Sequence, residues 1–195
     1  MVILATPHAR FHRSFLEAVD EYRAAGEARY DGVVDWPAEG DFPGVVFTRE
    51  GLEDPAEFQR LVDHRTGDEH PGSPRPPGWC TTTHWWMADP DVTDRFVGSI
   101  SLRHNITHPL LATIGGHVGY SVRPSARRQG FAGDALRQVV ALAGPRGIPR
   151  LLVTCDVDNV ASATVIERCG GVLEDEQQGK RRYWIRATPL GKAGQ

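Results

Sequence analysis

The chain has 195 residues, of which 40% are apolar and 24% are charged, a balance typical of a globular protein with a substantial core. Its net charge of −3 argues against a nucleic-acid-binding surface, and no apolar run is long enough to span a membrane. The N-terminus lacks a signal-peptide pattern, and the three cysteines (Cys80, Cys155 and Cys169) are widely spaced. We therefore expect a cytoplasmic protein with reduced thiols and no bound metal.

The first 53 residues predict one edge strand, one helix and one long loop. Residues 1–5 form a short apolar run that suits an edge strand. Apolar and aromatic residues then recur at helical spacing, which predicts a helix from His8 that Gly26 can end. Residues 30–53 show no sustained period and predict a loop, with a short extended piece at 45–47.

A second helix is predicted from Asp54-Pro55, because aspartate caps a helix well and proline suits its first turn. The stretch that follows, residues 66–78, carries four prolines and predicts an irregular surface loop. Loops of this length in compact domains are often functional, so this one is a candidate lid over a substrate.

Two strands follow and predict a hairpin, one at Trp79–Ala88 and one at Arg95–Arg103. Trp85 and Trp86 are neighbours on the first strand, so their side chains must face opposite sides of the sheet. A short helical segment is predicted near residues 110–114, before the chain enters its most informative stretch.

That stretch runs from Gly115 to Gly133 and reads as a strand, a turn and a helix start. A strand is predicted from His117 to Val122, ending near Arg123 because Pro124 cannot continue a central ladder. A basic loop with small residues then opens a helix, which exposes unpaired backbone N–H groups. Those donors and the helix dipole favour a bound phosphate.

Two common phosphate-binding motifs do not match this loop. A P-loop requires a lysine directly after its second glycine, and none is present. The dinucleotide fingerprint requires three spaced glycines, whereas the loop offers Gly130, Ala132 and Gly133. An anionic ligand of another kind is therefore predicted here.

The rest of the chain predicts a strand, a helix and a final hairpin. Residues 150–155 form a continuous apolar run, as in a buried parallel strand. Asn159 to Cys169 has helical spacing, with Asn159 as a candidate N-cap. Residues 172–187 predict a hairpin around Gly179-Lys180, and the tail from Pro189 is expected to be frayed.

Two local motifs resemble those of the GNAT superfamily of acyl-CoA N-acyltransferases. The first is Arg127-x-x-Gly130-x-Ala132, which lies between a strand and a helix. The second is Asn159-x-x-Ser162-x-x-x-Ile166-Glu167-x-x-Gly170, on the helix after the next strand. The order of elements from Trp79 onward is also similar to the GNAT order. The sequences of residues 115–124 and 150–159 are similar to those of a bacterial branch of predicted acetyltransferases.

The resemblance implies an α/β (α+β) fold with a mixed, mostly antiparallel sheet of about six to seven strands flanked by helices, whose fourth and fifth strands splay apart. It implies one domain over residues 1–195, with the cofactor core at about 79–187 and the acceptor-side helices and loops in 1–78. The co-substrate it implies is acetyl-CoA. Backbone groups of the predicted central strand are expected to pair with the pantetheine arm, and those of the loop to hold the pyrophosphate. The cofactor-binding residues implied are Tyr120, Ser121, Val122, Arg127, Arg128, Gln129, Gly130, Phe131, Ala132, Gly133, Asn159 and Ser162.

The chemistry implied is direct attack of an amine on the acetyl carbonyl, which needs a base near the acceptor. His117 and His104 are the candidate bases, although either could be a hydrogen-bonded structural residue. Arg103 could bind an acceptor carboxylate. The tyrosine that usually acts as the acid in this family is replaced by Ile166, so the thiol must leave as thiolate or be protonated by water or another residue.

The acceptor expected is the primary amine of a small molecule, and neither a nucleic acid nor a membrane is expected as a partner. A protein or peptide N-acetyltransferase is an alternative, which an open acidic groove would favour over a closed pocket. A catalytically silent acyl-CoA-binding module is another, supported by the missing tyrosine. The final hairpin offers an edge through which a homodimer could form.

Overall fold

The computed structural model describes residues 1–187 of the chain, so the predicted fraying from Pro189 lies outside the described residues. A seven-stranded sheet in the order β1-β4-β5-β6-β7-β9-β8 forms its centre. The strands are β1 (Ile3–Ala5), β4 (Thr82–Ala88), β5 (Phe96–Arg103), β6 (Val118–Val122), β7 (Arg150–Asp156), β8 (Val172–Gln177) and β9 (Lys180–Arg186). Neighbouring strands are antiparallel except β6 and β7, which confirms the predicted fold class.

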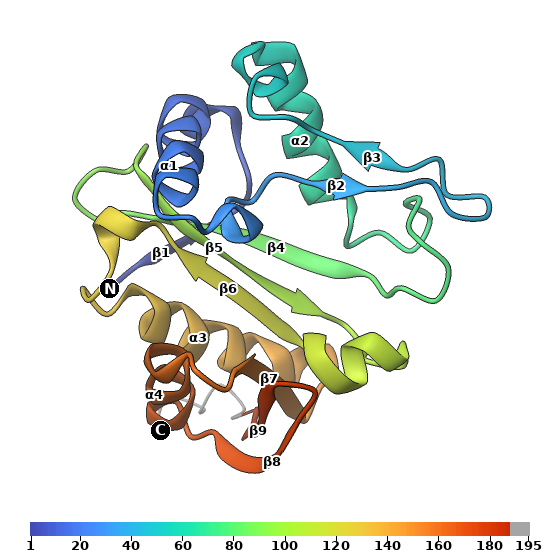
Figure 1. Cartoon of the computed structure of the whole chain (residues 1–195), viewed down its shortest axis with the longest axis vertical. Coiled ribbons are helices and arrows are strands. Elements are labelled where there is room, and N and C mark those ends of the chain that lie inside the picture. The colour runs from blue at the N-terminus through green and yellow to red at the C-terminus, as the bar shows by residue number, and fades with distance from the viewer. Residues whose placement is uncertain (188–195) are drawn as a thin grey trace, which may run out of the picture.

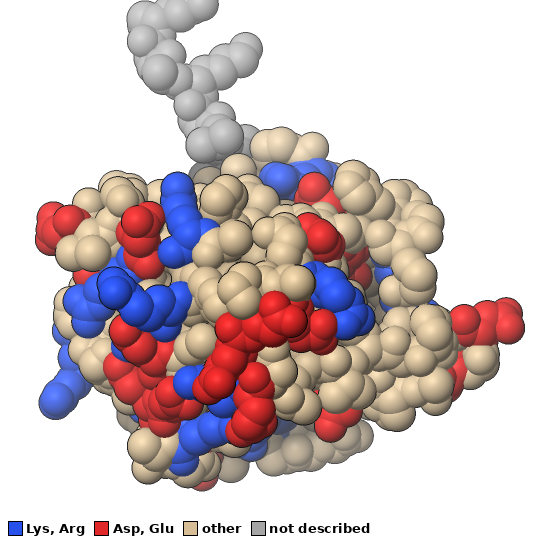
Figure 2. Space-filling model, turned by 90° about the horizontal axis from the view of Figure 1, so that it is seen from above, with Lys and Arg blue, Asp and Glu red and all other residues tan. Residues whose placement is uncertain are grey.

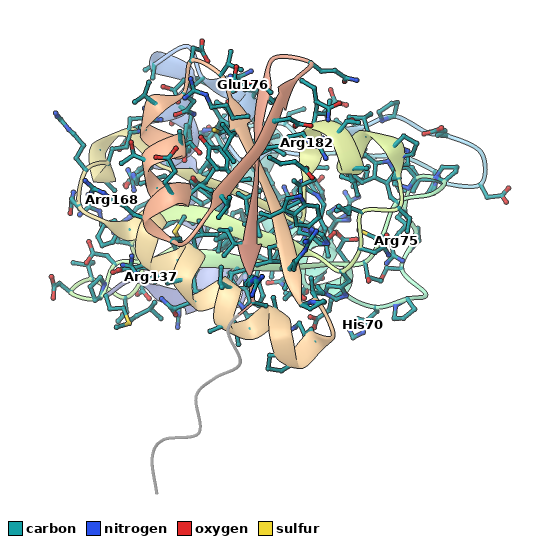
Figure 3. All side chains as sticks on the ribbon, turned by 90° about the horizontal axis from the view of Figure 1, so that it is seen from below. His70, Arg75, Arg137, Arg168, Glu176 and Arg182 are labelled. Atoms are coloured by element: carbon teal, nitrogen blue, oxygen red, sulfur yellow. The ribbon has the colours of Figure 1, made fainter. Side chains whose placement is uncertain are left out.

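Helices cover both faces of this sheet. They are α1 (His12–Ala24), α2 (Pro55–Gly67), α3 (Phe131–Ala143) and α4 (Val160–Arg168). Figure 1 shows α1 and α2 on one face and α3 and α4 on the other, and Figure 3 shows the latter two side by side. A small pair of strands, β2 (Asp35–Trp36) and β3 (Val45–Val46), lies on the α1–α2 side.

Each face has its own apolar core because the strands alternate and each helix turns one stripe inward. On the α1–α2 face, Phe15, Phe58 and Trp86 pack together with their rings 5.2 to 5.8 Å apart. On the other face, the buried stripe of α3 packs against strands β5 to β7. Trp86 belongs to the first core and Trp85 packs on the second, which confirms their opposite orientation.

The N-terminal elements differ from the prediction by a few residues. Helix α1 starts at His12, preceded by a short 3₁₀ turn that the His8 ring caps by accepting the Arg10 N–H at 3.0 Å. Helix α2 begins at Pro55 with Asp54 as its cap, as predicted, but it continues to Gly67 and shortens the expected loop. The β2–β3 pair occupies a region predicted to be mostly loop, since strands this short leave little periodicity to detect.

Strands β6 and β7 separate after a single register pair, Val118 with Val153. By contrast, β5 and β6 pair over five positions, from Gly98–Val122 to Leu102–Val118. The predicted splay is therefore present, and it leaves an opening beside the later half of β6. Both motifs identified in the sequence border this opening, one in the loop after β6 and one at the start of α4.

Candidate active site

Alternate residues of β6 turn their backbone groups toward the opening. The bonds from Arg103 N–H to His117 C=O and from Arg123 N–H to Val97 C=O, 2.8 and 2.9 Å, fix which residues face β5. Because an antiparallel ladder alternates, Gly119 and Ser121 also bond toward β5, and Tyr120 and Val122 face the opening. The backbone N–H and C=O of Ser121 therefore point away from a ligand in the β6–β7 opening. Its side chain lies on the α1–α2 face of the sheet.

The loop after β6 presents a row of free backbone donors. The first backbone bond of α3 runs from Asp134 N–H to Gly130 C=O, at 3.0 Å. Within residues 1–187, the N–H groups from Arg128 to Gly133 have no backbone or side-chain acceptor. Arg128 and Gly130 have positive φ angles of 63° and 84°, which curl the loop, and a Cβ on Gly130 would meet no atom within 4 Å. Such a cradle of N–H groups at a helix start suits a pyrophosphate.

The side chains of this loop differ in what they can do. Arg127 donates to both Glu27 carboxylate oxygens at 2.9 and 2.5 Å and to the Val122 carbonyl at 3.1 Å, so it ties the loop to the N-terminal region. Arg128 is exposed, with no partner within residues 1–187. Gln129 is exposed and reaches the Ser125 carbonyl at 3.5 Å, Phe131 packs on the core, and Ala132 and Gly133 lie in the first turn of α3. Their predicted contacts with a cofactor stay predictions.

The start of α4 closes the same opening from the β7 side. Asn159 caps the helix, its Oδ1 accepting the Ser162 N–H at 2.9 Å. The Ser162 hydroxyl lies 2.7 Å from the Tyr120 hydroxyl, and burial raises the pKa of Tyr120 to about 12. Ile166 is fully buried in the core, so this position supplies no acid. The group that stays protonated at this end of the opening is Tyr120.

A pocket of about 350 Å³ lies on the α1–α2 face and reaches the same strand. Its floor is formed by β4, β5 and β6, including Ser101, Gly119 and Ser121. Its walls come from α2, from residues 29–42 and from the proline-rich loop after α2. That loop lines the pocket with Asp68, Pro74, Arg75 and Trp79, the placement expected of a lid. The Arg75 guanidinium holds it together by donating to the carbonyls of Asp68 and His70.

Neither predicted base lines this pocket. His117 is buried, and its Nδ1 accepts the Leu152 N–H at 2.9 Å, so the ring proton must sit on Nε2. Burial, helped by the positive charge of Arg103, lowers the pKa of His117 to about 4. His104 has both ring nitrogens 2.8 Å from a threonine hydroxyl, Thr81 on one side and Thr83 on the other. Both histidines have the contacts of structural residues, and the geometry does not support a catalytic role for either.

The buried His117 makes stability depend on pH. Its pKa is about 4 in the folded protein against an ordinary 6.5, so the folded state takes up its proton less readily than the unfolded chain. The contribution of His117 to the free energy of unfolding is thus fully present above pH 6.5 and is lost as the pH falls toward 4. The loss amounts to roughly 2 to 3 kcal/mol at about pH 4.5. His117→Gln, whose amide oxygen can still accept the Leu152 N–H, should lose less stability between pH 7 and 4.5 in urea unfolding. Equal losses in both proteins would contradict this origin.

A different histidine faces the pocket, and an aspartate orients it. His84, on β4, has its Nε2 2.9 Å from Asp68 Oδ2, so Nε2–H donates to the carboxylate. Burial lowers the pKa of His84 to about 4 although the bond to Asp68 opposes this, and the ring is neutral at pH 7. Its Nδ1 has no partner within residues 1–187 and is not sealed from the pocket. The imidazole is neutral, with one nitrogen oriented by a carboxylate and the other without a partner among the described residues. Its low pKa makes it a weak base, so a proton on Nδ1 would depend on the Asp68 carboxylate to stabilise the imidazolium.

Sequence reasoning missed this pair because Asp68 and His84 belong to different elements. One residue directly follows α2 and the other lies in mid-strand, and no short motif links them. The available signal was alternation, since Thr82, His84 and Trp86 share a face of β4 and all three line the pocket.

No group of three or more His, Cys, Asp or Glu side chains within residues 1–187 is arranged to hold a metal ion. In the same part of the chain, no helix combines the length and apolarity that a membrane span requires. Acidic and basic side chains are interspersed on the α1–α2 face in Figure 2, so that face carries no broad patch of one sign.

Comparisons with known proteins agree with this geometry. The protein-family model described as an acetyltransferase (GNAT) domain matches residues 36–172 of this chain. Among solved structures, the microcin C7 self-immunity acetyltransferase MccE, in complex with acetyl-CoA and AMP, is 16% identical with a TM-score of 0.57, covering 95% of this chain and 92% of its own. RimL, a ribosomal L7/L12 alpha-N-protein acetyltransferase in complex with coenzyme A, is 18% identical with a TM-score of 0.56, covering 95% and 93%. A ribosomal-protein-S5-alanine acetyltransferase from Vibrio fischeri is 18% identical with a TM-score of 0.57, covering 95% and 92%. No curated protein matches the sequence.

At these identities the solved structures show the shared fold, and the family model, which spans more than half of the chain, shows the family. The β6–β7 opening and the N–H cradle fit the acyl donor that the resemblance implied. The chain belongs to the GNAT family of acetyltransferases, whose acyl donor is acetyl-CoA.

Proposed function

We propose that this protein is an N-acetyltransferase that moves an acetyl group from acetyl-CoA to the primary amine of a small molecule by direct attack. The observation that carries the proposal is that the acceptor pocket and the opening between β6 and β7 both border β6. The donor opening is bordered by the backbone of Tyr120 and Val122, and the pocket on the other face is floored by Gly119 and Ser121. An amine in the pocket and a thioester in the opening would therefore meet beside β6, where β7 departs from it.

The residues of the pocket supply the base. The acceptor enters as an ammonium ion and must lose a proton before its nitrogen can attack. We assign this task to His84, whose Nδ1 takes the proton directly or through a water while Asp68 holds the ring. The thioester of acetyl-CoA supplies the acetyl group. The N–H of Tyr120, which faces the opening, is placed to stabilise the oxyanion that forms.

The start of α4 supplies the acid. The departing thiolate needs a proton, and the position that usually provides it is the buried Ile166. The Tyr120 hydroxyl, hydrogen-bonded to Ser162, is protonated at neutral pH and stands at the predicted thioester end of the opening. We infer that Tyr120 takes over the role of the missing tyrosine from a different element. Asn159 then acts mainly as the cap that positions Ser162.

The enclosure of the pocket favours a small acceptor over a peptide. Loop residues close it from two sides, and Asp68 is the one carboxylate among the described residues that line it. A peptide would need a wider groove to hold the residues that follow its N-terminus. Protein acetylation stays a second candidate because RimL, which has the same fold, is a ribosomal-protein acetyltransferase.

We further propose that residues 1–195 act as one domain, with residues 79–187 holding the donor and residues 1–78 walling the acceptor pocket. The arrangement supports this, since Arg127 of the donor loop is paired with Glu27 of the N-terminal region. A cytoplasmic location agrees with three cysteines that form no disulfide among the described residues. The edge strand β8, with Val172 and Leu173 exposed, stays a candidate dimer surface.

The test is release of free coenzyme A from acetyl-CoA in the presence of a panel of small amines and short peptides. We expect release that depends on a small amine and slower release with peptides. Faster turnover with peptides would favour the protein acetyltransferase. Binding of acetyl-CoA without turnover on any acceptor would contradict the proposal and favour the silent acyl-CoA-binding module.

A further inference from the structure

The acceptor pocket carries more positive charge than its own residues neutralise. Four arginines line it against the single carboxylate of Asp68, counting residues 1–187. Burial lowers the pKa of both lining histidines, His64 and His84, so neither adds charge at pH 7. The balance of charge is therefore decided by the partners of the four arginines.

Two of these arginines have acidic partners. Arg29 lies 3.1 Å from Asp156, which also binds Lys180. Arg75 lies 3.9 Å from Asp68, and its remaining contacts are with loop carbonyls. Their charges are accounted for by the protein itself.

The other two, Arg65 and Arg103, have no carboxylate partner within residues 1–187. Arg65, on α2, donates to the Gly32 carbonyl at 3.0 Å. Arg103, on β5, donates to the carbonyls of Gly115 and Gly116 at 3.0 and 3.1 Å. Each guanidinium is thus oriented by neutral acceptors, its other N–H groups have no partner among the described residues, and both residues line the pocket.

The two guanidinium groups lie in one region of the site. Burial lowers the pKa of both although the negative charge of Asp68 opposes this, and the positive charge of Arg103 lowers the pKa of Arg65 further. A Cβ built on Gly119 would lie only 3.5 Å from Arg103 Nη2, so this cation stands over the strand that separates acceptor and donor. Asp68 is the one carboxylate among the described lining residues that acts on both cations, and it is also bound to His84 and lies 3.9 Å from Arg75, so it offsets only part of their charge. Two half-buried cations that share one carboxylate with other groups leave an electrostatic cost that a bound anion would lower.

We infer that Arg65 and Arg103 bind an anionic group of the acceptor, a carboxylate or a phosphate, so that the substrate is a primary amine that also carries an acid. This inference rests on the proposed function, whose acceptor it narrows. Guanidinium groups match both anions with paired N–H donors. The tilted pair of Trp36 and Trp79, with ring centroids 4.9 Å apart, offers an apolar wall for the body of such a molecule.

The test compares acceptors that differ only in the acid. Phenylalanine is set against phenylalaninamide for the carboxylate, and 2-aminoethyl phosphate against ethanolamine for the phosphate. We expect kcat/KM to favour at least one acid over its neutral partner by about 10- to 100-fold, the effect of losing one or two charge-assisted hydrogen bonds. Which pair shows the larger ratio identifies the anion.

The variants Arg103→Gln and Arg65→Gln should each reduce this ratio toward one, whereas Arg103→Lys, which keeps the charge, should retain part of it. Equal kcat/KM for acid and neutral acceptors in the wild type, or a ratio that neither glutamine variant changes, would overturn the inference.

A binding measurement separates this inference from the proposed function. N-acetylphenylalanine and N-acetyl-2-aminoethyl phosphate, which no longer have an amine to acetylate, should raise the melting temperature of the wild type more than their neutral counterparts and lose this effect in Arg103→Gln. If no amine is acetylated but one of these anions stabilises the protein in this way, the anion site is supported and the proposed acetyl transfer is contradicted. If amines are acetylated but neither anion binds selectively, the proposed acetyl transfer is supported and the anion site is contradicted.

Discussion

Replacing Gly130 with aspartate should weaken acetyl-CoA binding by at least about 100-fold. The substitution places a negative charge at the mouth of the N–H cradle formed by residues 128–133, where we expect the pyrophosphate. Two like charges about 4 Å apart near a protein surface repel by roughly 4 kcal/mol, so a hundredfold loss is the lower bound. The fold should survive, because a Cβ at Gly130 meets no atom within 4 Å and aspartate tolerates a positive φ better than most residues. Isothermal titration calorimetry measures the change.

Two matched variants separate charge from backbone strain. Gly130→Ala keeps the strain of a side chain at φ 84° without the charge, and should change the Kd by less than about tenfold. Gly147→Asp adds the same charge at another left-handed glycine with open space, at the far end of α3, and should leave the Kd unchanged. An affinity in Gly130→Asp equal to that of the wild type would remove the donor site from this loop.

Replacing His84 with glutamine should lower kcat by about 100- to 10,000-fold, the usual contribution of general base catalysis. Glutamine can still donate a hydrogen bond to Asp68 but has no lone pair basic enough to take a proton from an ammonium ion. The Kd for acetyl-CoA should stay within about twofold, because His84 lines the acceptor pocket and not the β6–β7 opening. Steady-state kinetics with saturating acetyl-CoA give kcat, and calorimetry gives the Kd.

His104→Gln is the control for this variant. His104 is near the same strands but bonds to Thr81 and Thr83 instead of lining the pocket, so its loss should change kcat by less than about threefold. If His104→Gln or His117→Gln lowers kcat as much as His84→Gln does, the assignment of the base to the His84–Asp68 pair is wrong.

The parts of the fold that could be predicted depend on local signals. Pro124 ends β6, a left-handed glycine at position 130 opens α3, and Asp54 caps α2, each through interactions within a few residues. The mixed, mostly antiparallel sheet and the splay of β6 from β7 were expected only from the family resemblance, because strand pairing is a long-range property. The predicted first residues of α1 and β4 were the least accurate, because the ends of helices and strands depend on tertiary packing.

The features of the candidate site also differ in whether they depend on local or on long-range interactions. The N–H cradle could be predicted because backbone donors at a helix start follow from local geometry alone. The His84–Asp68 pair and the Arg127–Glu27 pair could not, because each joins residues that only the tertiary fold brings together. His117 is the opposite case: its position at the head of β6 suggested a catalytic base, whereas in the fold its Nδ1 accepts the Leu152 N–H. Its predicted role as a base stays a prediction.

The central claim is that this pocket brings an amine to a thioester held beside β6, and the most direct test is the identity of the bond that forms. The wild-type protein is incubated with acetyl-CoA and the best small amine from the panel, and the product is identified by mass spectrometry and nuclear magnetic resonance. We predict an N-acetyl amide, formed in equal amount with free coenzyme A. An O-acetyl ester, an acetylated enzyme, or acetyl-CoA that stays bound and intact would contradict the account.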